Sequence, residues 1–205
     1  MYFSNEFLKD HMKIKGSLFK SYTYQVENLE QIKSYLNKLQ IKYSDASHIC
    51  YGYRIYDLRQ VDLFFNPSIV EFGKDDGEPS GTAGRQIINV LKQKDIINRV
   101  VFIIRYFGGI KLGIPGLIEA YKGSSQLVLK KINLQKWIMF SNVKINLEYN
   151  QIAMLKSKLS KYDATILEIK YEECINIIIR IPSKNLSLWK KFLSEKSNGS
   201  IKFID

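Results

Sequence analysis

Two glycine-rich segments hold most of the residues in this 205-residue chain whose types and spacing could do chemistry. Residues 75–85 read DDGEPSGTAGR, and residues 105–116 read RYFGGIKLGIPG. Each segment leads into a predicted helix, where unpaired backbone N–H groups and the positive end of the helix dipole attract an anion. Glycine also lets a ligand approach the backbone closely. The pattern therefore favours a phosphate-binding site at these segments.

Basic side chains accompany both segments. Arginine can bind a phosphate through two parallel N–H bonds, and five of the six arginines lie between residues 54 and 105. In a chain with 25 lysines, this clustering suggests that geometry as well as charge matters there. An aromatic ring at the second segment could also stack on a base. The predicted binding residues are Asp75, Asp76, Gly77, Glu78, Gly81, Thr82, Gly84, Arg85, Arg105, Tyr106, Gly108, Gly109, Lys111 and Gly113.

The same glycines are also typical of tight turns that only precede a helix. Neither segment matches a nucleotide-binding fingerprint. Ile114 and Pro115 stand where a Walker loop has Lys and Ser or Thr, and the G-x-G-x-x-G pattern is absent. A specific anion site and a structural turn are therefore both open interpretations.

The acidic trio of Asp75, Asp76 and Glu78 could hold Mg²⁺ or supply an acid and a base. An acidic residue near a helix start also simply complements the helix dipole. His48 and Cys50 lie two apart on a predicted strand and share a face, but a reactive pair normally comes from separate elements. We therefore expect a buried thiol beside a partly satisfied imidazole, with no catalytic residue, no metal and no cofactor.

The composition describes a folded protein. Apolar residues make up 45% of the chain and aromatic residues 13%, which excludes an intrinsically disordered protein. No apolar run approaches the ~18 residues of a membrane span, and residues 1–16 contain no apolar block of signal-peptide type. Cys50 and Cys174 are far apart and fit two free thiols in a reducing compartment. We expect a cytoplasmic protein with no membrane partner.

The net charge of +11 predicts attraction to polyanions such as RNA. Residues 1–137 carry 20 basic and 13 acidic side chains, and residues 138–205 carry 11 and 7, so neither part is a dedicated basic tail. Part of this charge is dispersed lysine, which a genome-wide nucleotide preference can also produce. RNA or the ribosome is the expected partner, a protein partner is the alternative, and nothing in the sequence is specific to DNA.

The elements that must position these residues form two α+β domains, residues 1–134 and 138–205. In the second domain, apolar periodicity predicts a β-α-β-β-α-β order, which is the ferredoxin-like arrangement. Its predicted strands are 138–148, 164–171, 175–181 and 200–204, and its predicted helices are 151–162 and 183–196.

The first domain is also predicted as a mixture of strands and helices. Its predicted elements are an extended segment at 13–26, helices at 28–40, 82–94 and 117–132, and strands at 48–56, 68–72 and 99–107. The strand at 99–107 is apolar on both faces, so we expect it at the centre of a sheet. Each glycine-rich segment thus joins a strand to a helix.

Together, the two glycine-rich segments resemble the signature of the IMPACT family, in its bacterial YigZ-like branch. The resemblance covers nearly the whole chain. It implies an N-terminal IMPACT domain folded like the second domain of small-subunit ribosomal protein five, followed by a ferredoxin-like C-terminal domain. The two domains in this family resemble the fourth and fifth domains of the ribosomal translocase. The resemblance further implies a role near the ribosome or RNA, since eukaryotic relatives regulate translation initiation, and no enzyme activity is firmly tied to the family.

Three positions depart from the family pattern. Leu18 stands where the family has arginine, Ile49 replaces a second histidine, and Pro115 replaces a glycine. Losing that histidine weakens a catalytic or metal role for the strand. The predicted function is a non-enzymatic, cytosolic, translation-associated protein that binds RNA or a ribosomal surface and regulates translation. The alternatives are a small Mg-dependent enzyme acting on a phosphorylated or nucleotide substrate and a protein–protein regulatory adaptor.

Overall fold

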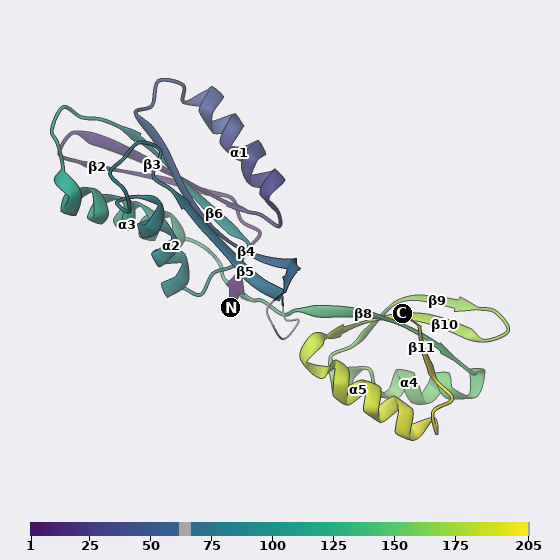
Figure 1. Cartoon of the computed structure of the whole chain (residues 1–205). Coiled ribbons are helices and arrows are strands. Elements are labelled where there is room, and N and C mark those ends of the chain that lie inside the picture. The colour runs from purple at the N-terminus through teal and green to yellow at the C-terminus, as the bar shows by residue number, and fades with distance from the viewer. Residues whose placement is uncertain (62–66, 205) are drawn as a thin grey trace. The chain divides into compact units, whose positions relative to one another are not determined.

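The computed structural model describes residues 1–61 and 67–204. The chain divides into two units, Met1–Trp137 and Ile138–Asp205 (Figure 1). Each unit has its own hydrophobic core. Both units combine helices with antiparallel sheets, so the predicted two-domain α+β class is confirmed. Among the described residues, no helix has both the length and the apolar character that crossing a membrane requires.

The main sheet of the first unit has the strand order β2-β3-β6-β4-β5, and every neighbouring pair is antiparallel. Its strands are β2 (Leu8–Ile14), β3 (Ser17–Gln25), β4 (His48–Val61), β5 (Pro67–Lys74) and β6 (Arg99–Tyr106). The predicted central position of β6 is confirmed, because it lies in the middle and nearly all its residues are buried. A separate two-stranded sheet pairs β1 (Tyr2–Phe3) with β7 (Gln135–Lys136).

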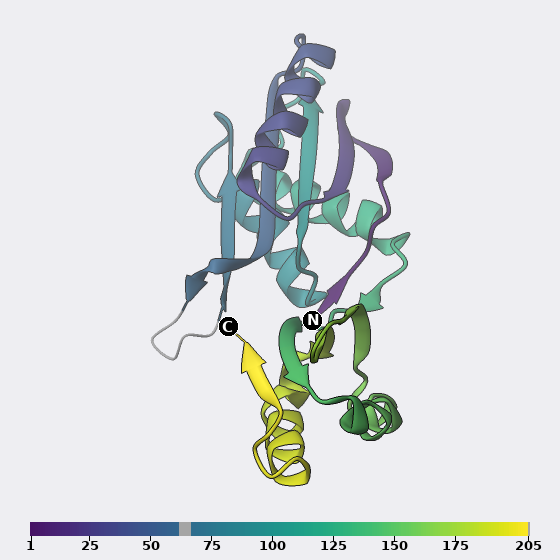
Figure 2. The same cartoon turned by 90° about the vertical axis from the view of Figure 1, so that its right-hand side faces the viewer.

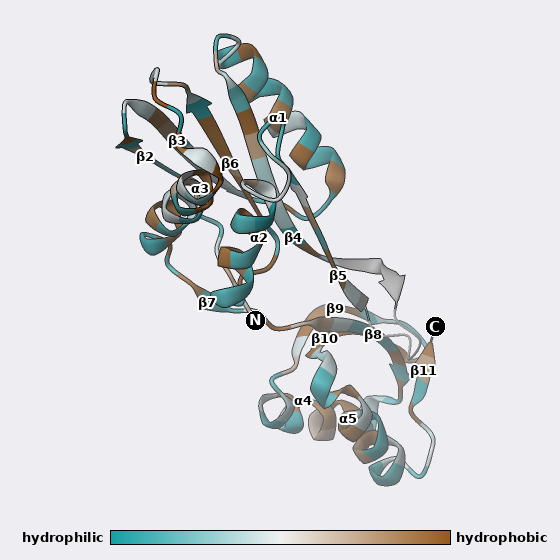
Figure 3. Cartoon of the chain, turned by 60° about the vertical axis from the view of Figure 1, so that its left-hand side comes forward, coloured by the Kyte–Doolittle hydropathy of each residue, from teal (hydrophilic) through white to brown (hydrophobic). Residues whose placement is uncertain are grey.

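Helices cover both faces of the main sheet. Helix α1 (Leu29–Lys42) packs on one face, and α2 (Gly84–Gln93) and α3 (Gly113–Lys130) pack on the other (Figure 2). Since the side chains of a strand alternate between the two faces of a sheet, one strand contributes side chains to both cores. Phe102 of β6 packs under α1, and Ile103 packs under α2 and α3. Figure 3 shows apolar and polar residues alternating along α1, as expected for a helix with one buried face.

The β2–β3 hairpin is the main difference from the predicted elements of this unit. The sequence predicts one extended segment at 13–26, whereas the structure contains two paired strands. They are joined by a turn at Lys15 and Gly16, where both residues adopt positive φ (43° and 79°). Polar and charged residues on the exposed face of β2 hid this strand from a search for apolar runs.

The second unit has the ferredoxin-like order β-α-β-β-α-β that the sequence predicts. Its strands are β8 (Phe140–Leu147), β9 (Thr165–Tyr171), β10 (Ile175–Pro182) and β11 (Lys202–Ile204), and its helices are α4 (Ile152–Lys158) and α5 (Ser183–Lys196). Short 3₁₀ turns, Tyr149–Gln151 and Ser160–Tyr162, flank α4. The sheet order is β11-β8-β10-β9, and Leu155 and Trp189 of the helices pack against Ile145 and Ile177 of the sheet.

Candidate functional site

The carboxylate of Asp75 occupies the helix N-terminus that the sequence predicts as a phosphate site. Its Oδ1 accepts hydrogen bonds from the backbone N–H groups of Ala83 (3.0 Å) and Gly84 (2.8 Å), and its Oδ2 accepts one from Gly81 (2.9 Å). These donors lie at the start of α2, where a negative charge also balances the helix dipole. The first glycine-rich segment therefore carries its own anion, and a phosphate would have to displace Asp75.

Asp76 uses its side chain and its carbonyl to hold β4. Its Oδ2 accepts a bond from the backbone N–H of Ile49 (2.7 Å), and its carbonyl oxygen lies 2.8 Å from Nδ1 of His48. Asp76 and Gly77 both have positive φ (48° and 88°), which forms the tight reversal before α2. Because a carbonyl only accepts, Nδ1 of His48 is the donor in this bond.

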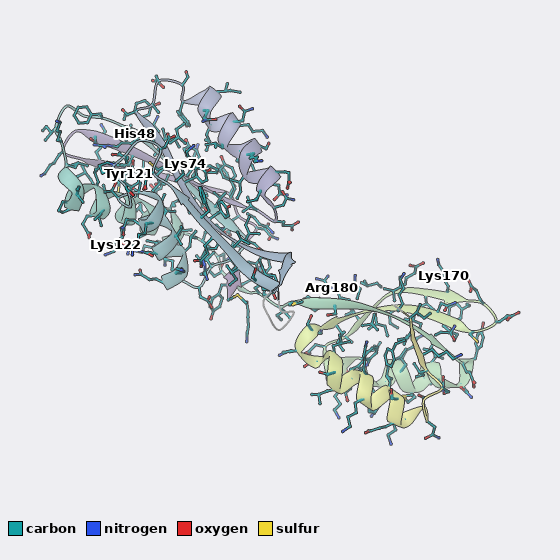
Figure 4. The ribbon with its side chains drawn as sticks, viewed as in Figure 1. His48, Lys74, Tyr121, Lys122, Lys170 and Arg180 are labelled. Atoms are coloured by element: carbon teal, nitrogen blue, oxygen red, sulfur yellow. The ribbon has the colours of Figure 1, made fainter. Side chains whose placement is uncertain are left out.

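Glu78 is a buried carboxylate that joins three elements. Its Oε1 accepts bonds from Nη1 of Arg105 on β6 (2.6 Å) and from the hydroxyl of Tyr121 on α3 (2.8 Å). Nε2 of His48 on β4 lies 4.0 Å from the same oxygen. His48 and Tyr121 accordingly lie at the same end of the first unit (Figure 4). Charge-assisted bonds of this kind are short and strong, so Glu78 fixes the loop against the sheet and α3.

Cys50 belongs to the same buried cluster. Its Sγ donates to the carbonyl oxygen of Asp75 (2.9 Å) and lies 3.3 Å from the hydroxyl of Tyr121. Burial raises the pKa of the Cys50 thiol and the pKa of the Tyr121 phenol, so both stay protonated at neutral pH. A protonated, fully buried thiol is a poor nucleophile. Cys50 therefore packs and donates, as the sequence analysis expects.

The predicted binding residues are divided by their exposure to solvent. The exposed ones are Gly77, Arg85, Gly109, Lys111 and Gly113; the half-buried ones are Asp75, Asp76, Gly81, Tyr106 and Gly108; the buried ones are Glu78, Thr82, Gly84 and Arg105. Arg105 is only 5% exposed and is paired with Glu78, so its guanidinium is not available to a phosphate. Arg85 and Lys111 remain as exposed cations, and neither forms an ion pair within the described residues.

The acidic trio does not converge on a common point. The carboxylates of Asp75, Asp76 and Glu78 bind three separate sets of protein donors. Across residues 1–56 and 68–204, no three His, Cys, Asp or Glu side chains gather closely enough to hold a metal ion. The arrangement gives the Mg-dependent alternative no support.

A direct backbone contact joins the second glycine-rich segment to the β2–β3 turn. A Cβ atom added to Gly108 would overlap the carbonyl group of Gly16, and one added to Gly16 would overlap the carbonyl of Gly108. Ser17 strengthens this contact, because its Oγ accepts a bond from the N–H of Gly108 (3.2 Å). Gly16 and Gly108 are therefore required by packing, independent of any ligand.

A groove on the α1 face of β2 and β3 is the candidate feature that the sequence analysis misses. It encloses about 460 Å³. It is lined by Lys9, Asp10, His11, Lys13, Leu18, Lys20, Tyr22 and Tyr43. The signal that could have revealed it is the alternation of Lys9, His11 and Lys13, which places three basic side chains on one face of a strand.

Two family models match the chain. One, described as the Impact N-terminal domain, matches residues 15–129, and the other, described as a domain of unknown function, matches residues 145–200. The resemblance noted from the glycine-rich segments is thus confirmed.

Proteins from two bacteria are similar over most of their length. An IMPACT family member of Haemophilus influenzae is 29% identical over 192 residues, which cover 92% of this chain and 88% of the relative. The IMPACT family member YigZ of Escherichia coli is 25% identical over 195 residues, 94% of this chain and 91% of the relative. A crystal structure of a hypothetical protein has a TM-score of 0.65 at 24% identity and covers 99% of this chain and 95% of its own, which shows the shared fold.

Proposed function

Because the chain belongs to the IMPACT family, we propose that it is a cytosolic, non-enzymatic protein that binds an RNA-rich surface of the ribosome and regulates translation. The family resemblance supports a role near the ribosome. The observation that carries the proposal is the surface of the second glycine-rich segment, where three large apolar side chains are exposed around a lysine. We call Phe107, Ile110, Lys111 and Ile114 the tip loop.

The tip loop has the composition of a contact surface. Phe107, Ile110 and Ile114 are 51%, 56% and 58% exposed, although they fall within eight residues of one another. Clustered exposed apolar side chains mark interaction sites, and aromatic and aliphatic anchors dominate the energy of many interfaces. Lys111 adds a positive charge between them, which suits a surface that also carries phosphate.

Contacts with Ser47 and Arg105 hold the tip loop in place. The N–H of Phe107 donates to Oγ of Ser47 (3.0 Å), and the guanidinium of Arg105 lies 5.7 Å from the centre of the Phe107 ring. Glu78 holds that guanidinium in place. A braced loop loses little conformational freedom on binding, which favours affinity. Arg105 thereby supports the interaction through Phe107 and not through a phosphate contact.

Co-sedimentation with ribosomes across a salt series tests the proposal. The variant Phe107→Ser with Ile110→Ser should weaken binding at least about tenfold, the effect of losing anchor residues. Leu167→Ser with Leu188→Ser is the matched control, because both side chains are exposed (53% and 65%) and belong to the second unit. Failure of the wild-type chain to pellet at low salt, or equal binding by the loop variant, would contradict the proposal.

The exposed apolar side chains also favour the second candidate function, a protein–protein adaptor. The two are separated by Lys111→Ala. If the tip loop meets RNA, this change reduces the dependence of affinity on salt, because each lysine on a phosphate releases counterions. If the loop meets an apolar protein surface, the salt dependence stays unchanged while Phe107→Ser still abolishes binding.

A further inference from the structure

The lining of the groove on β2 and β3 is unusually basic. Alternation along β2 places Lys9, His11 and Lys13 on the α1 face of the sheet, and all three are exposed. The register pairs Lys9 with Tyr22 and His11 with Lys20 on β3. The core beneath α1 includes residues of β3, β4 and β6 but none of β2. Helix α1 therefore leaves this outer strip of the sheet open.

Among the described residues, none of these cations has a carboxylate partner on its own face of the sheet. The ammonium of Lys20 lies 5.0 Å from the ring centre of Tyr43 and 5.1 Å from that of Tyr106, so its neighbours are aromatic rings. Asp10 belongs to the opposite face of β2 and is paired with Lys131 (2.7 Å). Asp10 also lines the groove, but its carboxylate is paired with Lys131, and Lys9, Lys13 and Lys20 form no ion pair among the described residues. The groove therefore presents a net positive charge.

The floor of the groove supplies an oriented hydroxyl. The hydroxyls of Tyr22 and Tyr43 are hydrogen-bonded to each other. Burial and the hydrogen bond to Tyr43 raise the pKa of Tyr22. Burial also acts to raise the pKa of Tyr43, but the hydrogen bond with Tyr22 and the nearby ammonium of Lys42 outweigh burial, so the pKa of Tyr43 is lowered. Either oxygen can be the donor in this bond, so one phenolic proton of the pair is left for another acceptor.

We propose that this groove binds the phosphate backbone of single-stranded RNA, with Lys9, Lys13 and Lys20 as charge partners and the Tyr43 hydroxyl as a hydrogen-bond donor. Lys20 lies opposite His11, which is halfway between Lys9 and Lys13 on β2. Residues two apart on a strand are about 6.6–6.8 Å from each other, so the three lysines recur along the groove at a spacing comparable to that of successive phosphates in an extended strand. The volume is that of a small-ligand pocket, which suits a short stretch of one strand and not a duplex. The choice of RNA among polyanions rests on the proposed function.

Lysine dominates the contacts, which predicts weak sequence preference. Lysine acts as a point charge on phosphate, whereas reading a base edge requires matched donors and acceptors in a fixed geometry. The groove should therefore accept different bases with similar affinity.

Fluorescence anisotropy with a labelled, unstructured oligouridylate tests the groove directly. The triple variant Lys9→Gln, Lys13→Gln and Lys20→Gln should weaken binding at least about tenfold and reduce the salt slope by about 2, since each phosphate contact contributes about 0.7 for a single strand. The control removes three other lysines that form no ion pair in the described chain, Lys33, Lys94 and Lys130. It carries the same charge change and should bind nearly as well as the wild-type chain.

Two tyrosine variants distinguish the contribution of the Tyr43 hydroxyl to RNA binding from that of the lysine charges. Tyr43→Phe keeps the ring under Lys20 but removes the donor, so affinity should fall several-fold with no change in the salt slope. Tyr22→Phe leaves the Tyr43 hydroxyl in place and should bind like the wild-type chain. Thermal unfolding of both variants shows whether the fold is intact, and equal RNA affinity of the two folded variants overturns the role of Tyr43.

Three outcomes would contradict the proposal that the groove binds single-stranded RNA. They are unchanged binding by the triple lysine variant, retention by anionic lipid vesicles but not by oligouridylate, and much tighter binding of a matched single-stranded DNA. Comparable affinity for the DNA and RNA strands supports phosphate recognition. If the chain pellets with ribosomes but does not bind oligouridylate, the proposed function is supported and the groove proposal is contradicted. If it binds oligouridylate but does not pellet with ribosomes, the groove proposal is supported and the proposed function is contradicted.

Discussion

The first glycine-rich segment and the β2–β3 groove are two places where an anion could bind, and they differ in what their polar groups already do. At the segment, the N–H groups at the start of α2 are taken by Asp75, and Arg105 is taken by Glu78. In the groove, Lys13 and Lys20 have no carboxylate partner among the described residues. The comparison shows that the polar groups of a distinctive motif can all be used to stabilise the fold.

The two regions also differ in how they are built. The three carboxylates of the segment bind donors from β4, β6, α2 and α3. The groove consists of ordinary lysines and tyrosines on two adjacent strands. Substitutions should therefore affect stability in the first region and binding in the second.

The largest expected effect is that of Glu78→Ala. Removing one partner of a buried ion pair leaves the other charge uncompensated and costs about 3–5 kcal/mol of unfolding free energy. Urea unfolding measures the loss. Glu119→Ala is the control, because Glu119 is an exposed carboxylate on α3 whose nearest ammonium, that of Lys122, is 3.8 Å away. A loss below about 1 kcal/mol for Glu78→Ala, near that of a surface pair, would erase the distinction between the two regions.

Glu71 on β5 is an intermediate case, because its carboxylate is only partly buried between Arg54 and Lys92. Burial alone would raise the pKa of this carboxyl, but the hydrogen bonds from Lys92 and Arg54 outweigh it and hold the pKa below 4.5. Since the folded pKa lies below the unfolded value, the stability it adds is present above about pH 4.5 and is lost as the pH falls through the folded pKa.

Glu71→Gln should therefore reduce unfolding free energy by about 1–3 kcal/mol at neutral pH, the worth of a hydrogen bond to a charged group. The gap between variant and wild type should close in acid. Unfolding curves recorded from neutral to acidic pH provide the measurement, and a gap that widens on acidification would show the assigned sign to be wrong.

The smallest of the three effects is expected from Asp75→Ala, which removes the carboxylate at the start of α2. Loss of a helix cap costs about 0.5–2 kcal/mol. The vacated N–H groups should then accept inorganic phosphate, which should raise the melting temperature of the variant more than that of the wild-type chain. If phosphate stabilises the wild-type chain to the same extent, Asp75 does not block the site and the contrast with the groove disappears.

Much of the fold could be predicted from the sequence. Strong apolar periodicity located β6 and the whole β-α-β-β-α-β unit, because those elements bury continuous or alternating apolar residues. The β2–β3 hairpin was missed, since the outer face of β2 carries Lys9, His11 and Lys13 and only its inner face packs on the core. A strand at the edge of a sheet with one open face gives a weak signal.

The candidate site was located but not resolved by sequence reasoning. The motif placed Glu78 and Arg105 in two segments that each lead into a helix, yet it could not show that they bind each other, because they are 27 residues apart. Tyr121, the third partner, is 43 residues beyond Glu78. Pairings of that range depend on how β6 and α3 pack. The alternation of Lys9, His11 and Lys13 indicates only one strand of the groove, because the groove also depends on the register of β2 with β3 and on where α1 stops covering the sheet.

The contact between Gly16 and Gly108 has a mechanical consequence. With two backbones touching and no side chain between them to absorb a displacement, the hairpin turn and the start of the tip loop form a rigid joint. A ligand that shifts β2 and β3 would move the tip loop as well. Occupancy of the groove and occupancy of the tip loop would then be thermodynamically linked, with each changing the affinity of the other by the same factor.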